Sequence, residues 1–169
     1  MEEDAKIIRG IKNGDDNAIE AFVRKYYPQI LQYCRIHTRD QQSAEDMTQE
    51  TFLRFFRSLQ NYQHCGKASN YLYVIAGNCC RDDWRRVKPL SLEEVPEPFG
   101  DDMEELTQVR LALARLPEEL REIAILFFIQ ERRQTEIAQI LGIGLPLVKY
   151  RVRRAKKLLR SFLGEEETP

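Results

Sequence analysis

The stretch TEIAQILGIGLPLVKYRVRRAKKLLRSFL, residues 135–163, decides how the end of this chain folds. Its first part carries apolar residues at helical spacing, and Gly142-Ile143-Gly144 then breaks the helix. A second apolar stripe runs from Val148 to Phe162, with Pro146 suited to the first turn of its helix. The small Ala138, the turn glycine and Val148 have the spacing of a helix-turn-helix. The stretch therefore predicts two helices packed across a tight turn.

The second of these helices is strongly basic. It carries lysines and arginines between its apolar residues and no acidic residue, whereas the solvated face of an ordinary helical hairpin mixes both signs. This pattern favours DNA binding. Arginine can hold guanine through two hydrogen bonds, and tyrosine can contact a base edge or a phosphate. If the apolar stripe faces inward, the candidate DNA contacts are Lys149, Tyr150, Arg151, Arg153, Arg154 and Lys157.

The composition bounds the kind of protein. The 169 residues suffice for one medium domain or two small ones, and the formal net charge is only −1. No apolar run reaches the roughly eighteen residues of a membrane span. The amino-terminal MEEDAKIIRG is acidic, unlike a signal peptide. We therefore expect a cytoplasmic protein with reduced cysteines.

Helical patterns recur along the chain, while strand patterns are nearly absent. We expect Ser43 to cap a helix, and Tyr26-Tyr27-Pro28 to interrupt another. The helices expected before the helix-turn-helix span residues 5–12, 17–24, 30–36, 44–59, 70–86 and 106–116. Leu116-Pro117-Glu118-Glu119 opens one more helix, whose apolar residues lie within 122–130.

One segment departs from the helical pattern. Residues 89–105 read PLSLEEVPEPFGDDMEE, with three prolines, a glycine, seven acids and no base. Such a segment forms neither a helix nor a core easily, so it reads as a flexible acidic linker. The sequence therefore predicts an all-α protein of two small domains, residues 1–88 and 107–169, joined by a linker at 89–106.

Two further segments leave their interpretation open. From Tyr62 to Arg86, aromatic residues alternate with bases and amides, which suits unpaired nucleotides, but tyrosines in a core would give the same composition. In residues 44–52, AEDMTQETF, acids and a glutamine line one helical face above a phenylalanine. By itself this second pattern is more typical of a solvated amphipathic helix.

Little in the sequence suits a metal or a catalytic reaction. His64-Cys65 and Cys79-Cys80 offer soft ligands, but neighbouring side chains on a helix point about 100° apart and cannot easily share an ion. The two histidines, His37 and His64, stand beside no nucleophile with an orienting acid. No glycine-rich phosphate loop occurs. We expect no metal, no cofactor, no small-molecule substrate and no enzymatic activity.

Taken in order, these motifs resemble an extracytoplasmic-function (ECF) sigma factor of bacterial RNA polymerase. AEDMTQETFLRFF resembles the polymerase-binding helix of that family, and NYLYVIAGNCCRDDWRR resembles the helix that reads and opens the minus-ten element. LPEELREIAILFF, TEIAQILGI and VKYRVRRAKKLL resemble the domain that reads the minus-thirty-five element. The resemblance spans nearly the whole chain and implies a factor that directs promoter-specific transcription initiation.

The resemblance also implies partners and sites. Glu45, Asp46, Gln49, Glu50 and Phe52 would lie on or under the surface that meets the clamp helices of the largest polymerase subunit. The linker would thread the RNA exit path, and an anti-sigma factor would give an indirect link to the membrane. The residues implied at the melted minus-ten element are Tyr62, His64, Lys67, Ser69, Asn70, Tyr71, Asn78, Trp84, Arg85 and Arg86.

The chain departs from the family at three points. Tyr71 stands where the family often has tryptophan, so melting would depend more on residues 84–86. Pro146 and Leu147 replace a small residue and a threonine at the start of the recognition helix. Arg133 replaces the serine that usually caps the preceding helix, and Thr135 is the expected substitute.

Two other functions fit parts of the sequence. A stand-alone helix-turn-helix regulator would not need the helix at 44–56 or the aromatic set from Tyr62 to Trp84. A sigma-like decoy that only binds an anti-sigma protein would not need an acid-free recognition helix. Run-off transcription with core polymerase distinguishes all three.

Overall fold

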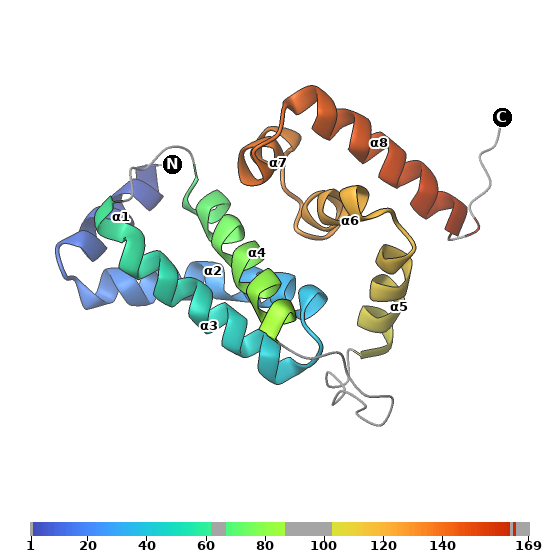
Figure 1. The fold of residues 1–169 in the computed structure, drawn as a ribbon. Helices are drawn as coiled ribbons and strands as arrows, with labels where there is room; N and C mark the ends of the chain where they lie inside the picture. Colours follow the sequence, from blue (N-terminus) through green and yellow to red (C-terminus); the bar gives the residue numbers. More distant parts are fainter. Residues whose placement is uncertain (1, 62–66, 87–102, 163, 165–169) are drawn as a thin grey trace. The chain divides into compact units, whose positions relative to one another are not determined.

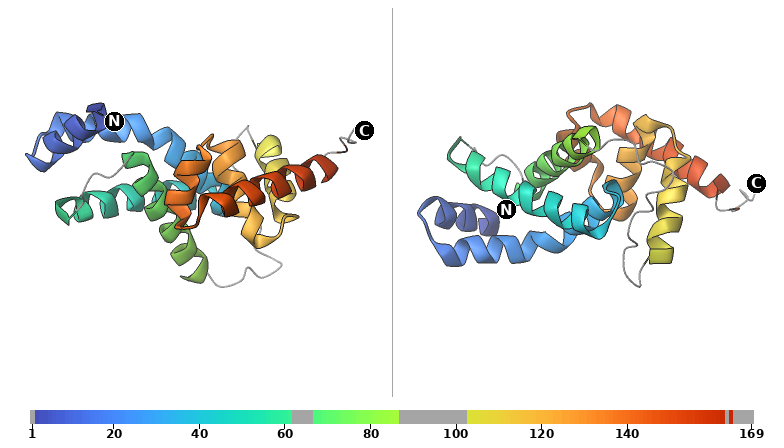
Figure 2. Two further views of the ribbon diagram at one scale, coloured as in Figure 1. Left: turned by 90° about the horizontal axis from the view of Figure 1, so that it is seen from above. Right: turned by 60° about the horizontal axis from the view of Figure 1, so that its bottom comes forward.

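The computed structural model describes residues 2–61, 67–86, 103–162 and 164 (Figure 1). The chain forms two compact units, residues 1–98 and 99–169, which are taken here one at a time. All regular structure in the described residues is helical, so the prediction of an all-α fold with two small domains is confirmed. Figure 2 shows the same helices from two further directions.

The first unit is built around α3. Helix α3 (Gln41–Ser58) packs against both α2 (Asp16–His37) and α4 (Ala68–Arg86), and α1 (Glu2–Lys12) packs on α2. Aromatic side chains fill the space between α2 and α3: the rings of Phe22 and Phe55 stack with centroids 4.7 Å apart. A short 3-10 turn, Leu59–Asn61, ends α3. Residues 62–66 of the predicted 61–67 loop lie outside the described residues.

Two expectations for this unit are wrong. Helix α2 runs without a break through Pro28, because Tyr26 and Ile30 on either side of the proline are buried and their packing outweighs the lost backbone hydrogen bond. Helix α3 begins before Ser43. Its cap is Asp40, whose Oδ1 accepts a 2.7 Å hydrogen bond from the backbone N–H of Ser43.

The second unit contains α5 (Met103–Ala114), α6 (Glu118–Ala124), α7 (Gln134–Leu141) and α8 (Leu145–Phe162). Helix α6 continues into a π-helical turn, Ile125–Ile129, in which the N–H of Gln130 reaches the carbonyl of Ile125 at 3.0 Å. Helix α5 starts at Met103, so the last four residues of the predicted linker are helical. The remaining linker residues, 89–102, lie outside the described part of the chain.

Helices α7 and α8 form the predicted helix-turn-helix. Gly142 ends α7 with φ 66°, a left-handed conformation that glycine adopts without strain. Its N–H donates to the carbonyl of Ala138. Val148 of α8 is fully buried, as the spacing predicted. The expectation that Thr135 caps α7 is wrong, because the cap residue is Arg133 and its side chain makes no capping hydrogen bond.

Candidate nucleic-acid and polymerase interfaces

The apolar stripe fixes the rotation of α8. Val148, Val152 and Ala155 are buried against the rest of the unit, and α8 packs on α6 and α7. Of the six predicted DNA contacts, Arg151 is half-buried and the others are exposed, with Tyr150 at 52%. The helix therefore presents one apolar side to its own domain and one cationic side to solvent.

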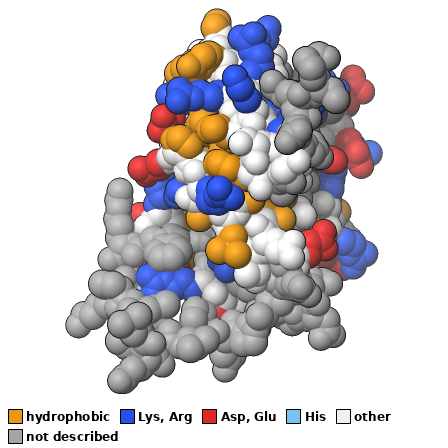
Figure 3. Space-filling view, turned by 90° about the vertical axis from the view of Figure 1, so that its right-hand side faces the viewer, with side chains coloured by type: hydrophobic (Ala, Val, Ile, Leu, Met, Phe, Trp, Pro, Cys, Tyr) orange, Lys and Arg blue, Asp and Glu red, His pale blue; other side chains and the backbone are white. Residues whose placement is uncertain are grey.

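The cationic side of α8 has no acidic partner among the described residues. None of the described acidic side chains forms an ion pair with a lysine or arginine of this helix. One internal contact orders the surface: Arg154 Nη1 donates to Tyr150 Oη at 3.4 Å. Figure 3 shows a face of the molecule where lysine and arginine side chains (blue) lie among hydrophobic ones (orange). Such charges are available to the phosphates of a nucleic acid.

Helix α3 carries the residues predicted to meet polymerase. Asp46 and Gln49 are exposed, while Glu45 and Glu50 are half-buried. Each of the three acids is held by a residue four positions away on the same helix. Gln41 donates to Glu45, and Gln42 to Asp46, both at 2.9 Å, and Arg54 Nε lies 3.0 Å from Glu50.

Phe52 is buried beneath the predicted polymerase surface, while its neighbour Leu53 is exposed. Phe52 is only 5% exposed, and its ring lies 6.2 Å from that of Phe22 and 6.1 Å from that of Tyr27. Leu53, the next residue, is 50% exposed. At about 100° per residue it shares the face of Asp46 and Gln49. Sequence reasoning missed this residue, although its helical phase relative to Asp46 would have revealed it.

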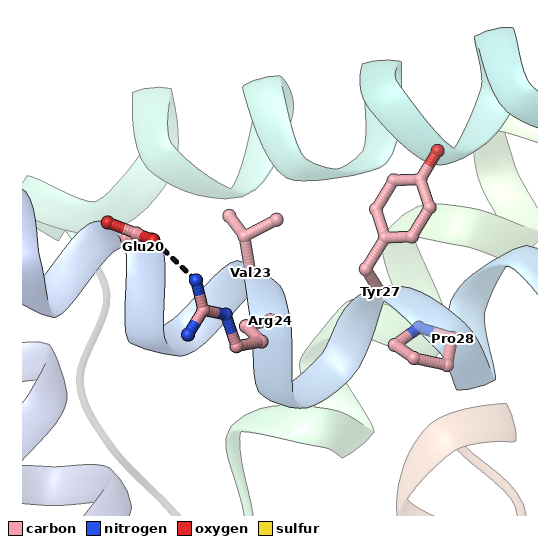
Figure 4. Close-up of a pocket in the computed structure, with 5 residues that line it drawn as sticks. All are labelled: Glu20, Val23, Arg24, Tyr27 and Pro28. Carbon is pink, nitrogen blue, oxygen red and sulfur yellow. Dashed lines mark hydrogen bonds and ion pairs between the residues drawn. The ribbon is translucent and has the colours of Figure 1, made fainter.

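A shallow hollow lies on the surface of α2, beside α3. It is lined by Glu20, Val23, Arg24, Tyr27 and Pro28 of α2 (Figure 4). Val23 and Tyr27 are directed toward α3, while Arg24 and Glu20 form an ion pair of 2.6 Å on the solvent side. The surface that lines the hollow is almost entirely apolar and adjoins the Tyr27–Phe52 stack.

The predicted minus-ten residues on α4 and just before it fall into three groups by exposure. Ser69 and Asn70 are buried in the first turn of this helix, Lys67 and Tyr71 are half-buried, and Asn78 is exposed. Tyr71 is anchored, since its hydroxyl donates to Ser58 Oγ at 3.0 Å and its ring lies 5.7 Å from that of Phe55. Trp84, Arg85 and Arg86 end the helix, but their side chains are not described, and Tyr62 and His64 lie outside the described residues.

The cysteines are closer together than their sequence positions indicate. Cys34, Cys79 and Cys80 are buried free thiols, and Sγ of Cys34 lies 3.9 Å from Sγ of Cys80. The hydrogen bond from Cys80 lowers the pKa of Cys34, whereas burial raises the pKa of Cys79. Cys65 lies outside the described residues. Among the described side chains no three potential metal ligands lie together.

Comparison with known proteins decides between the alternatives. Sigma-70 region 2 matches residues 22–89, which include α3 and α4, and Sigma-70 region 4 matches residues 106–159, which include the helix-turn-helix. The chain belongs to the sigma-70 family. It is a sigma factor that directs promoter-specific transcription initiation.

Relatives that match more than nine tenths of the chain place it among the ECF sigma factors. The sigma factor is 30% identical to the ECF RNA polymerase sigma factor SigE of Mycolicibacterium smegmatis, over 92% of this chain and 66% of SigE. It is 29% identical to the ECF RNA polymerase sigma factor SigW of Bacillus subtilis, over 95% of this chain and 96% of SigW.

Two solved structures share the fold of the sigma factor. One is CnrH in complex with the cytosolic domain of CnrY, with a TM-score of 0.81 and 22% identity over 97% of this chain and 99% of that one. The other is the sigma factor RpoE in complex with the anti-sigma factor NepR from Bartonella quintana, with a TM-score of 0.70 and 20% identity over 88% of this chain and 98% of that one. No helix in the described parts of the sigma factor combines the length and apolarity needed to cross a bilayer.

Proposed function

We propose that this sigma factor binds core RNA polymerase through the exposed face of α3 and reads promoter DNA through α4 and α8. In this proposal it catalyses nothing itself and acts in the cytoplasm, where polymerase and promoters are found. The domains that carry the two tasks are residues 1–88 and 107–169, with a linker at 89–106.

The polymerase surface is argued from α3. Asp46 and Gln49 provide a polar, acidic rim, and Leu53 provides an exposed apolar side chain among them. An apolar centre within a polar rim is the usual anatomy of a protein interface. Phe52 contributes from below, because its burial fixes the rotation of the helix. The proposed partner is the pair of clamp helices of the largest subunit.

The duplex DNA surface is argued from α8, and this is the observation that carries the proposal. Its solvent side is cationic over several turns, and its charges are not paired with any described acid. The second helix of a helix-turn-helix enters the major groove. Tyr150, Arg153 and Arg154 then face base edges, while Lys149, Arg151 and Lys157 face phosphates.

The proposed minus-ten surface is based on the carboxyl-terminal half of α4. Asn78 is exposed, and Trp84, Arg85 and Arg86 follow it on the same helix. Tyr71 is anchored to α3, and Ser69 and Asn70 are buried. These three therefore support the fold of this region, and DNA contact falls to Asn78 and the residues after it.

A regulatory partner is the last part of the proposal. Both solved structures above were determined as complexes, one of them with a protein named as an anti-sigma factor. We propose that an anti-sigma protein also binds this chain and competes with polymerase. Any link to a membrane would then run through that protein.

Co-purification with core polymerase tests the α3 surface. Asp46→Arg reverses an exposed charge and should spare the fold while abolishing binding to core polymerase. Asp16→Arg, an equal charge reversal at an exposed position of α2, should bind normally. Retention of core polymerase by the Asp46→Arg protein would place its binding surface elsewhere.

A further inference from the structure

The exposed side of α8 contains an apolar residue that is not among the proposed DNA contacts. Leu147 is 39% exposed and precedes Tyr150 by three residues and Arg154 by seven. At about 100° per residue, these three side chains fall within a narrow arc of the helix surface. The arc lies away from the buried Val148 and Val152. The helix thus presents a stripe of one leucine, one tyrosine and one arginine to solvent.

Tyr150 and Arg154, the two later residues of this stripe, are already joined by a hydrogen bond. Arg154 Nη1 donates to the Tyr150 hydroxyl at 3.4 Å, one helical turn away. A guanidinium has five N–H donors, so this contact leaves donors for two hydrogen bonds to a guanine. Restraining the guanidinium before binding reduces the conformational entropy that binding costs. Tyr150 is therefore placed as a positioning residue for Arg154.

Leu147, the first residue of the stripe, differs chemically from the other two. A leucine in this position cannot donate or accept a hydrogen bond, so it carries no information about polar base edges. The one apolar group in the major groove is the C5-methyl of thymine. Residues near the start of a recognition helix are those that reach base edges. A half-exposed leucine at the third residue of α8 therefore suits a thymine methyl.

We propose that Leu147, Tyr150 and Arg154 form a single reading stripe, in which Leu147 contacts a thymine methyl and Tyr150 holds Arg154 toward a guanine. This inference rests on the proposed entry of α8 into the major groove. Seven residues span roughly 10 Å of helix, which corresponds to about three base-pair steps. The thymine and the guanine should therefore lie about three base pairs apart within the minus-thirty-five element.

Uracil substitution isolates the leucine contact. The wild-type protein with core polymerase first selects a duplex DNA from a random library. Each thymine of this duplex is then replaced, one at a time, by deoxyuracil, which lacks only the methyl group. At one position the wild type should bind about fourfold more weakly, since burying one carbon-sized apolar group contributes about that factor. Leu147→Ala should bind thymine and uracil equally there. Leu111→Ala, which truncates a 62% exposed leucine of α5, should keep the wild-type preference.

Tyr150→Phe isolates the positioning contact, because it removes only the hydroxyl. Arg154→Ala should abolish the preference for guanine at one position, and Tyr150→Phe should reduce it at that same position by about twofold to tenfold. In the Arg154→Ala background, Tyr150→Phe should have no further effect. The salt dependence of binding should be unchanged by Tyr150→Phe, because no phosphate contact is lost.

Three results would overturn the inference. The wild type could tolerate uracil at every position, Leu147→Ala could keep the methyl preference, or Tyr150→Phe could act independently of Arg154. Each of these outcomes leaves sequence-specific binding intact. If instead none of the α8 variants alters binding to any duplex, the proposed function of α8 itself fails, and Leu147 belongs to a surface for a protein partner.

Discussion

The hydroxyl of Tyr26 donates a 2.6 Å hydrogen bond to Oδ2 of Asp4, and this buried contact fastens α1 to α2. Lys25 Nζ lies 2.8 Å from the other carboxylate oxygen. Burial alone would raise the pKa of Asp4, but the hydrogen bonds from Lys25 and Tyr26 outweigh it and hold the pKa below its ordinary value. The ionised carboxylate is therefore part of the folded state of the first unit.

Stability of the first unit should depend on pH through Asp4. Because the pKa is lower in the folded than in the unfolded chain, the contribution is fully present above about pH 4 and is lost as pH falls through the folded value. Asp4→Asn should cost about 1.5–3 kcal/mol at pH 7, measured by urea unfolding. The gap between wild type and variant should narrow below about pH 4. A gap that stays constant down to pH 2 would show that folding does not lower the pKa of Asp4, and Asp16→Asn serves as an exposed control.

Neighbouring residues of α3 should separate stability from binding. Phe52→Ala removes a buried ring and should lower the free energy of unfolding by about 3–5 kcal/mol. Leu53→Ala removes a half-exposed side chain and should change stability by no more than about 0.5 kcal/mol. Leu53→Ala should nevertheless weaken the complex with core polymerase. Thermal unfolding and titration with core polymerase measure the two effects, and normal polymerase binding by Leu53→Ala would remove it from the interface.

The two groups of α8 residues should respond differently to salt. A phosphate contact adds affinity without sequence information, so Lys157→Ala should weaken binding to all promoters alike and reduce the salt slope by about one unit. A base contact discriminates, so Arg154→Ala should relax preference at one position. Titrations at two salt concentrations against single-position variants distinguish them. The reverse pattern would mean that the rotation assigned to α8 is wrong in the complex.

Limited proteolysis of the free protein tests the proposed domain boundaries. The segment between Leu90 and Asp102 contains prolines and acids but no apolar periodicity, so it has little with which to pack. Trypsin has no lysine or arginine to cut there, so a protease that cleaves after glutamate or aspartate should be used. First cuts within that segment are expected, leaving two resistant fragments. First cuts within α3 or α8 would contradict two separately folded domains.

Local signals predicted the second unit well, because its decisive features are close in sequence. Gly142 needs a left-handed conformation, and the stripe from Val148 fixes the rotation of α8, so both could be read from neighbouring residues. The first unit depends on long-range packing. The continuity of α2 through Pro28 and the approach of Cys34 to Cys80, 46 residues apart, are set by contacts between helices that no local pattern encodes.

In the candidate site, too, local sequence predicted some features, while others depend on packing between helices. The cationic side of α8 followed from periodicity, and the exposure of Leu53 could have been read from its helical phase relative to Asp46. The burial of Ser69 and Asn70, by contrast, depends on how α2, α3 and α4 pack together. The resemblance implied DNA contacts at Ser69 and Asn70, whereas the structure buries both side chains in the first turn of α4.

Run-off transcription with core polymerase on a promoter library is the most direct measurement of what this chain does. The account predicts that the protein directs core polymerase to a restricted set of promoters that share two elements. It also predicts that Asp46→Arg abolishes all transcripts, while Lys157→Ala lowers them uniformly. A protein that binds duplex sites specifically yet yields no promoter-dependent transcripts with core polymerase would contradict the account and favour a stand-alone helix-turn-helix regulator.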